Sequence, residues 1–178
     1  EFKCQGHGID ALPEFIGDAN QYAKKHKVEE RCKFEVGDIR RMVDNLHDYD
    51  MVILGSIGPV FGDVETTLLK VQNCTTDEGY VIFDDGHLSA TSKLKSQVYL
   101  SEKEIHRQIA EAKMKIVDQI ELTSDYVKKS NSEIYENIKK RAVELMKEYP
   151  ENQSLFEGYL RSQEEENDLL ENHITCVT

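Results

Sequence analysis

Long apolar runs, paired cysteines and an excess of basic residues are all missing from this chain of 178 residues. No apolar stretch approaches the ~20 residues that a membrane-spanning helix needs. The net charge is −12, whereas a protein that binds a nucleic-acid backbone usually concentrates lysine and arginine on its surface. We therefore expect a protein that binds neither a membrane nor a nucleic acid and that buries its core as one domain.

Cysteine is present at four scattered positions, Cys4, Cys32, Cys74 and Cys176, and no two of them form a Cys-x-x-Cys pair. This pattern argues against a zinc site and against a disulfide framework. We predict four buried, reduced thiols in a cytoplasmic protein.

Two strand-like segments each end in an aspartate, about one βα unit apart. Residues 2–10 end at Asp10, and residues 32–38 end at Asp38. Ligands of an open parallel sheet bind outside the carboxyl ends of its strands. Carboxylates placed there can accept hydrogen bonds from ribose hydroxyls and from an exocyclic amine. The pair predicts a site for a nucleotide-like cofactor, although each aspartate alone could equally cap a helix.

The first two-thirds of the chain alternates strand-like and helix-like patterns, which predicts an α/β fold with a mostly parallel sheet. Strands are expected at 2–10, 32–36, 49–54, 79–84 and 115–122, and helices at 13–26, 39–46, 63–73 and 101–113. The nearly continuous apolar run at 49–54 is typical of a strand covered on both faces. Two charged helices at 125–170, separated at Pro150, precede a final strand at 173–178.

This order of elements resembles the class I S-adenosylmethionine-dependent methyltransferases, a Rossmann-like three-layer fold with an antiparallel last strand. The resemblance covers residues 1–122 and 172–178, which would form the core of a single domain, while residues 125–170 would be a helical insert. It implies S-adenosylmethionine as the cofactor and methyl transfer by in-line displacement. Positioning of the reactants would then supply most of the acceleration.

The same resemblance implies roles for the residues at the strand ends. Asp10 would bind the ribose hydroxyls, and Asp38 would accept a hydrogen bond from the adenine amine. The implied cofactor-binding residues are Asp10, Ala11, Leu12, Gly37, Asp38, Ile39, Gly55 and Ser56, and the implied substrate-binding residues are Ile57 and Asp84.

The chain departs from the family at one place. The family's first strand and its glycine-rich loop would precede residue 1, and that strand normally lies in the centre of the sheet. Its absence would leave two strand edges unpaired in the core, which is costly. We therefore expect a truncated fragment whose cofactor binding is badly weakened or lost. Alternatively, the missing N-terminal segment, another chain or a rearranged strand pairing fills the gap, and the chain could form a homodimer.

Asp84, Asp85 and His87 follow the buried strand at 79–84, where this fold places the substrate. A histidine near a carboxylate can accept a proton, so His87 and Asp85 are the candidate catalytic bases. The simpler alternative is a solvated turn with positive φ at Gly86. These residues could also hold a divalent ion, but one short cluster does not define a metal site, and we predict no resident metal.

The loop at 55–59 reads Gly-Ser-Ile-Gly-Pro, where base-amino methylases carry an Asn-Pro-Pro-Tyr-like run. Together with the acidic charge, this loop favours a small-molecule acceptor. The insert at 125–170 would then form a cap or a dimer contact and set acceptor choice. Two other functions stay open: a nicotinamide-dependent oxidoreductase, in which an acid after the second strand also binds ribose, and a non-catalytic module that binds a partner through the insert.

Overall fold

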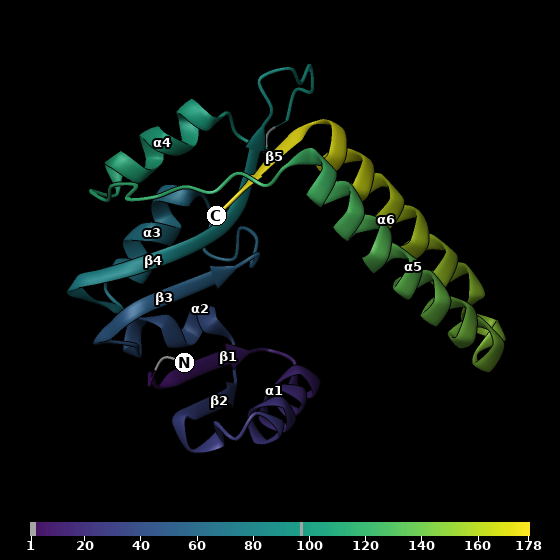
Figure 1. The fold of residues 1–178 in the computed structure, drawn as a ribbon, viewed down its shortest axis with the longest axis horizontal. Coiled ribbons are helices and arrows are strands. Elements are labelled where there is room, and N and C mark those ends of the chain that lie inside the picture. The colour runs from purple at the N-terminus through teal and green to yellow at the C-terminus, as the bar shows by residue number, and fades with distance from the viewer. Residues whose placement is uncertain (1–2, 97) are drawn as a thin grey trace. The chain divides into compact units, whose positions relative to one another are not determined.

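The computed structural model describes residues 3–96 and 98–178 of the chain. They form two compact units, Glu1–Ile53 with Pro59–Val81, and Leu54–Gly58 with Ile82–Thr178. The elements follow one another as labelled in Figure 1. The strands are β1 (Gly6–Asp10), β2 (Cys32–Val36), β3 (Tyr49–Gly55), β4 (Thr75–Leu88) and β5 (Ile174–Val177). The helices are α1 (Pro13–Lys25), α2 (Ile39–Met42), α3 (Val64–Gln72), α4 (Glu102–Glu111), α5 (Ser124–Glu148) and α6 (Gln153–Asn172), with 3-10 turns η1 (Glu29–Arg31), η2 (Val43–Asn45) and η3 (Pro150–Asn152).

The strands form two sheets. β1 and β2 are parallel, with Gly6 opposite Cys32 and Asp10 opposite Val36. The second sheet has the order β3-β4-β5, and β5 runs antiparallel to β4. The predicted α/β fold with an antiparallel last strand is confirmed.

In the first unit, α1 covers the β1–β2 pair, and it matches the predicted helix to within one residue at its end. Pro13 occupies the first turn, where its fixed φ suits the helix and its missing N–H costs nothing. Ala23 is buried against the pair. The expected strand at 2–10 is shorter, since β1 begins at Gly6, and Phe2 lies outside the described residues.

β3 is less covered than its apolar sequence predicts. Met51 and Ile53, which alternate onto one face of the strand, are 48% and 65% exposed. Among the described residues, β3 has β4 as its one hydrogen-bonded neighbour, and β1 has β2. The prediction of coverage on both faces is therefore wrong for this part of β3, and one edge of β1 and one of β3 are unpaired within residues 3–96 and 98–178.

The expected strand at 115–122 is wrong in extent. Glu121 forms an isolated antiparallel bridge with Val177, and Ile120 and Thr178 exchange backbone hydrogen bonds of 2.9 and 3.0 Å. Val117 is 66% exposed, so the apolar residues of this segment do not mark a buried strand. The segment does not form a longer strand because its partner, β5, has only four residues and offers few backbone groups for pairing.

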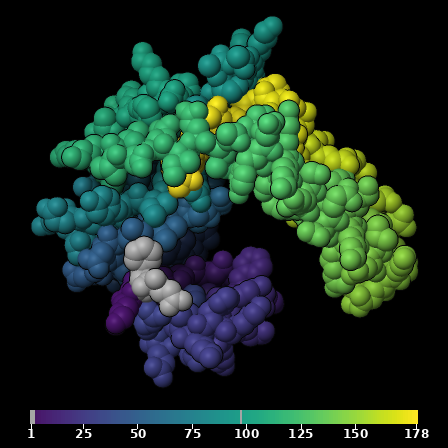
Figure 2. Space-filling view, in the orientation of Figure 1, coloured from purple at the N-terminus to yellow at the C-terminus, as the bar shows by residue number. Residues whose placement is uncertain are grey.

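The predicted pair of helices at 125–170 is confirmed as the α5–α6 hairpin, which turns at Pro150. Figures 1 and 2 show the two helices packed along their length. Asn131 donates a hydrogen bond to Glu171 at 3.2 Å, and the Tyr135 hydroxyl donates to Glu164. Three large apolar side chains of the hairpin are more than half exposed: Ile134, Leu155 and Tyr159.

The cysteines are free thiols, but they are not all buried as expected. Cys74 is 3% exposed and Cys4 lies at the surface, because Cys4 precedes β1 and has no neighbouring strand to cover it within the described residues. No helix of residues 3–96 and 98–178 is long and apolar enough to cross a membrane.

Candidate functional site

The carboxyl ends of β1 and β2 lie side by side in the first unit. Asp10 ends β1 opposite Val36, and the Gly37 N–H donates a 2.8 Å hydrogen bond to the Asp10 carbonyl. Asp38 follows directly. The parallel register therefore brings Asp10 and Asp38, both predicted from the sequence, to neighbouring strand ends on the same edge of the sheet.

The Asp10 carboxylate is only partly engaged. Its Oδ1 atom accepts a 2.7 Å hydrogen bond from the Leu12 N–H, which turns the chain toward α1. Oδ2 forms no hydrogen bond among the described residues. One carboxylate can therefore stabilise the turn and still accept from hydroxyl groups of a ligand. Ala11 and Leu12 are exposed beside it, as an adenine contact would require.

Asp38 is the N-cap of α2. Its Oδ1 atom accepts hydrogen bonds from the Arg40 N–H at 3.0 Å and from Arg40 Nε at 2.8 Å. Hydrogen bonds from the Arg40 guanidinium hold the pKa of the Asp38 carboxyl below its usual value. The group therefore stays an ionised acceptor well below neutral pH, and Oδ2 keeps one lone pair beyond its bond to Arg40 Nη2.

The residues on either side of Asp38 have constrained places. A Cβ atom at Gly37 would lie 2.1 Å from Met42 Sδ, so only glycine fits there without displacing that side chain. Ile39 is the first residue of α2. The side chain of Met42, the last residue of this short helix, therefore lies directly against the backbone of Gly37.

In the second unit, the loop after β3 meets the end region of β4. Ser56 has φ of +52°, a left-handed conformation that is unusual for a residue other than glycine. A Cβ atom at Gly55 would lie 3.9 Å from Asp84 Oδ2, and Asp84 Oδ1 accepts a 2.6 Å hydrogen bond from the Thr178 hydroxyl. Gly55 and Asp84 are thus adjacent, and Ile57 in the same loop is 39% exposed.

Gly86 does not form the solvated turn considered from the sequence. β4 continues to Leu88 and pairs there with β5, with Gly86 opposite Cys176. Asp85 is exposed at the surface of this ladder, where its Oδ1 atom accepts a 2.7 Å hydrogen bond from the Gly86 N–H. Desolvation by nearby protein atoms raises the pKa of the Asp85 carboxyl, which makes its carboxylate a stronger base.

His87 is only 6% exposed. Its Nδ1 atom lies 3.1 Å from the Leu88 carbonyl oxygen, which can only accept, so Nδ1 carries the proton. Nε2 is buried and has no hydrogen-bond partner among the described residues. Two glutamates that the sequence reasoning missed, Glu102 and Glu121, lie near it. They are too distant from His87 in the sequence to form a motif that could have been found.

A cavity of about 1030 Å³ lies in the first unit, but not at these strand ends. It is lined by residues of β1, β2 and β3, including His7, Glu35 and Tyr49. His7 there bonds to Glu35 Oε2 at 2.5 Å and to the Tyr49 hydroxyl at 2.6 Å, so both ring nitrogens are used in packing. The residues predicted to bind the cofactor at the carboxyl ends of β1 and β2, Asp10 and Asp38, do not line this cavity.

A family model described as a methyltransferase domain matches residues 1–149. The chain belongs to this family. It is therefore a methyltransferase with the class I fold, and S-adenosylmethionine is its cofactor, as the resemblance implied. The match favours a methyltransferase over a nicotinamide-dependent oxidoreductase.

Solved structures agree with this fold. An S-adenosylmethionine-dependent methyltransferase from Geobacter sulfurreducens, in complex with S-adenosyl-L-homocysteine, has a TM-score of 0.79 and 13% identity, covering 97% of this chain and 73% of its own. A second such complex, from Thiobacillus denitrificans, has a TM-score of 0.75 and 14% identity, and the match covers 98% of this chain and 75% of the other. YjhP from E. coli has a TM-score of 0.77 and 11% identity, and the match covers 97% of this chain and 74% of the other. None of the curated proteins compared with the sequence matches it.

Proposed function

We propose that this methyltransferase transfers the methyl group of S-adenosylmethionine to a small-molecule acceptor by in-line displacement. The observation that carries the proposal is the placement of Asp10 and Asp38 at neighbouring ends of two parallel strands, each with capacity to accept further hydrogen bonds. The bound cofactor supplies an activated methyl group on a sulfonium. The chain then has to bind, orient and exclude water.

Each strand end has a separate task in this proposal. Asp10 Oδ2 accepts from the ribose hydroxyls, and exposed Leu12 packs beside the adenine. Asp38 accepts from the exocyclic amine, while the backbone of Ile39 serves a ring nitrogen.

A small-molecule acceptor is favoured by two features of the sequence. The loop at 55–59 lacks an Asn-Pro-Pro-Tyr-like run, and the net charge of −12 disfavours a nucleic-acid substrate. If the acceptor must lose a proton, Asp85 is the more accessible base, since His87 Nε2 is buried. The α5–α6 hairpin acts as a cap or dimer contact that selects the acceptor.

The first test is a titration of the chain with S-adenosyl-L-homocysteine, followed in ¹H–¹⁵N NMR spectra so that weak binding is also detected. We expect the largest shifts at residues 10–12 and 37–39. Asp10→Asn keeps the side-chain oxygen that accepts from Leu12 but removes the charge, so it should weaken binding about tenfold.

Asp18→Asn is the matched control, because Asp18 is an exposed aspartate on α1. It removes the same charge and should leave affinity unchanged. Equal affinity of Asp10→Asn and the unchanged chain, or shifts confined to other regions, would overturn the assignment of the cofactor site. Transfer of the methyl group to candidate small amines, alcohols and thiols then tests the acceptor class.

A further inference from the structure

Three segments that are separate in the sequence meet around His87 in the second unit. His87 lies in β4, opposite Thr175 of β5. Its neighbour Leu88 bridges to Ser101, and the Leu88 N–H donates a 2.8 Å hydrogen bond to the Leu100 carbonyl, which places Glu102 at the start of α4 beside the strand. Glu121 is held on the other side by its bridge to Val177.

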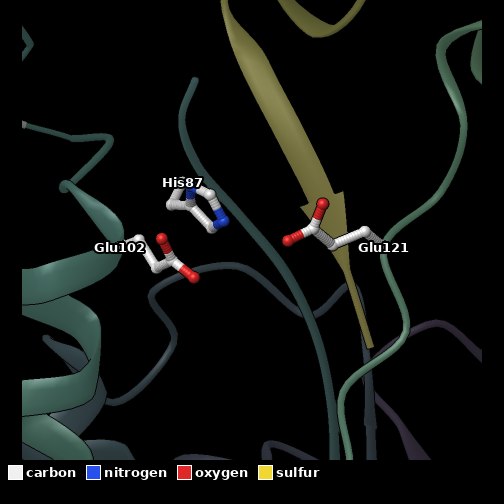
Figure 3. A group of neighbouring side chains, drawn as sticks. All are labelled: His87, Glu102 and Glu121. Carbon is white, nitrogen blue, oxygen red and sulfur yellow. The ribbon is translucent and has the colours of Figure 1, made fainter. Parts of the chain in front are cut away.

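The side chains of His87, Glu102 and Glu121 converge, as Figure 3 shows. One nitrogen or oxygen atom from each of the three lies within 4.8 Å of the others. The imidazole is buried, whereas both carboxylates come from exposed residues. The rigid member of the group is therefore the histidine, and the two glutamates have rotamer freedom to approach a common point.

The unpartnered Nε2 of His87 is the independent indication that this group binds something. A buried polar atom without a partner is rare in folded proteins and costs free energy. The proton on Nδ1, fixed by the Leu88 carbonyl, leaves a lone pair on Nε2 in the neutral ring. A backbone carbonyl that holds the other ring nitrogen is also the usual outer support of a metal-bound histidine.

We propose that His87, Glu102 and Glu121 form a site for a divalent transition-metal ion such as Zn²⁺. Two carboxylates with one neutral imidazole carry a charge of −2, which balances the ion. A mixed nitrogen and oxygen set suits Zn²⁺ or its first-row neighbours, whereas Mg²⁺ and Ca²⁺ prefer oxygen alone. Bonds of about 2.0–2.2 Å bring tetrahedral ligand atoms to roughly 3.4 Å from one another, so separations of up to 4.8 Å have to shorten by at most roughly 1.4 Å.

Such an ion would tie β4, the start of α4 and the segment before α5 to one another. The site does not rest on the proposed methyl acceptor or on the cofactor assignment. It departs from the sequence-based prediction of no resident metal, and it excludes a base role for His87, because a metal ion and a proton would compete for the same lone pair.

The experiment is a titration of the full chain with Zn²⁺ by calorimetry and with Co²⁺ by visible absorption. We expect one ion per chain and a cobalt spectrum without sulfur-to-cobalt charge transfer, which distinguishes this site from the free cysteines. In ¹H–¹⁵N spectra of the imidazoles, Zn²⁺ should shift Nε2 of His87 while Nδ1 stays protonated.

Glu102→Gln and Glu121→Gln should each weaken Zn²⁺ binding about tenfold or more, since loss of even an outer-shell partner costs that much. Glu148→Gln, which removes one exposed charge at the end of α5, should leave affinity unchanged. Unchanged affinity in both ligand variants, an unshifted His87 Nε2, an Nε2 that is protonated and paired with the glutamates, or a preference for Mg²⁺ would each overturn the proposal. None of these results bears on the cofactor titrations with Asp10→Asn and Asp18→Asn, so the metal site and the cofactor site can fail separately.

Discussion

Arg40 binds the carboxylate of Asp38 through two guanidinium hydrogen bonds, each of 2.8 Å. The two residues are adjacent to the turn that begins α2, so the pair fixes the orientation of a predicted cofactor ligand. Hydrogen bonds of this geometry favour the ionised carboxylate, which lowers the pKa of Asp38. The arginine therefore acts on the cofactor site through Asp38.

Replacing Arg40 should raise the pKa of Asp38 toward its ordinary value. In Arg40→Met the guanidinium charge and its two hydrogen bonds are lost while the backbone hydrogen bond stays, and the carboxyl should take up its proton at a higher pH in a ¹³C NMR titration. Arg41→Met is the control, because Arg41 lies 3.8 Å away and makes the smallest of the attractive contributions. Equal pKa values for Asp38 in the two variants would contradict the role given to Arg40.

Gly37→Ala should destabilise the first unit by about 1 kcal/mol, the low end of the usual cost of overpacking, because Met42 Sδ lies near the end of a flexible side chain that can move. The added methyl group would lie 2.1 Å from Met42 Sδ, so the side chain of Met42 or the whole of α2 has to move. Urea unfolding measures the change. Met42→Ala removes the side chain that causes the clash. Adding Gly37→Ala to the Met42→Ala variant should therefore cost less stability than adding it to the unchanged chain. An equal cost in both would show that the clash with Met42 is not the cause.

How far the sequence predicts this structure is seen in the strand ends. Asp10 and Asp38 were placed correctly at neighbouring ends because strand, helix and strand patterns alternate clearly there, and parallel pairing then fixes the edge. The engagement of Asp38 by Arg40 was not predicted. It depends on the tight turn into α2, which the sequence shows only through Gly37 and the cap residue.

The second unit was harder to predict, since its pairings join distant segments. β4 extends from Thr75 to Leu88, well beyond the apolar residues 79–84, because backbone hydrogen bonding to partner strands does not require apolar side chains. Glu121 lies near His87 because its segment forms a β-bridge with Val177 of β5, the strand that pairs with β4. Local periodicity carries no information about such contacts.

Ser56→Val should destabilise the second unit by about 1–2 kcal/mol, because a left-handed φ of +52° is costly for a β-branched side chain. Ser56→Gly should show no such loss, since glycine adopts positive φ readily. Thermal unfolding of the two variants measures the difference. If valine and glycine were tolerated equally, the left-handed conformation of this loop would not be required.

The four thiols should react with iodoacetamide at very different rates. Cys74 is 3% exposed, and burial raises the pKa of its thiol, so little of the reactive thiolate is present or accessible. Burial also raises the pKa of Cys176. We expect peptide mass spectrometry to show Cys4 modified first and Cys74 last, with the difference abolished in urea. Early modification of Cys74 in the folded chain would contradict its placement.

Glu104 should make stability depend on pH in the acid range. Arg107 donates hydrogen bonds of 2.9 and 2.5 Å to it, and Gln108 donates another of 3.1 Å, which together lower the pKa of Glu104 to about 2. The ordinary pKa of a glutamate is 4.5, and that of Glu104 is lower in the folded state. Above pH 4.5 the ionised Glu104 therefore contributes its full stabilisation. This contribution is lost as the pH falls from 4.5 toward 2.

Glu104→Gln should therefore reduce the loss of stability between about pH 5 and 2, the interval in which the folded and unfolded glutamates differ in protonation. The measurement is the urea midpoint at a series of pH values. Glu151→Gln removes an exposed charge outside α4 and should leave the slope as it is in the unchanged chain. Because the pair is solvent-exposed, high salt should weaken the effect, and a slope that is identical in Glu104→Gln and Glu151→Gln would show that Arg107 does not stabilise the ionised glutamate.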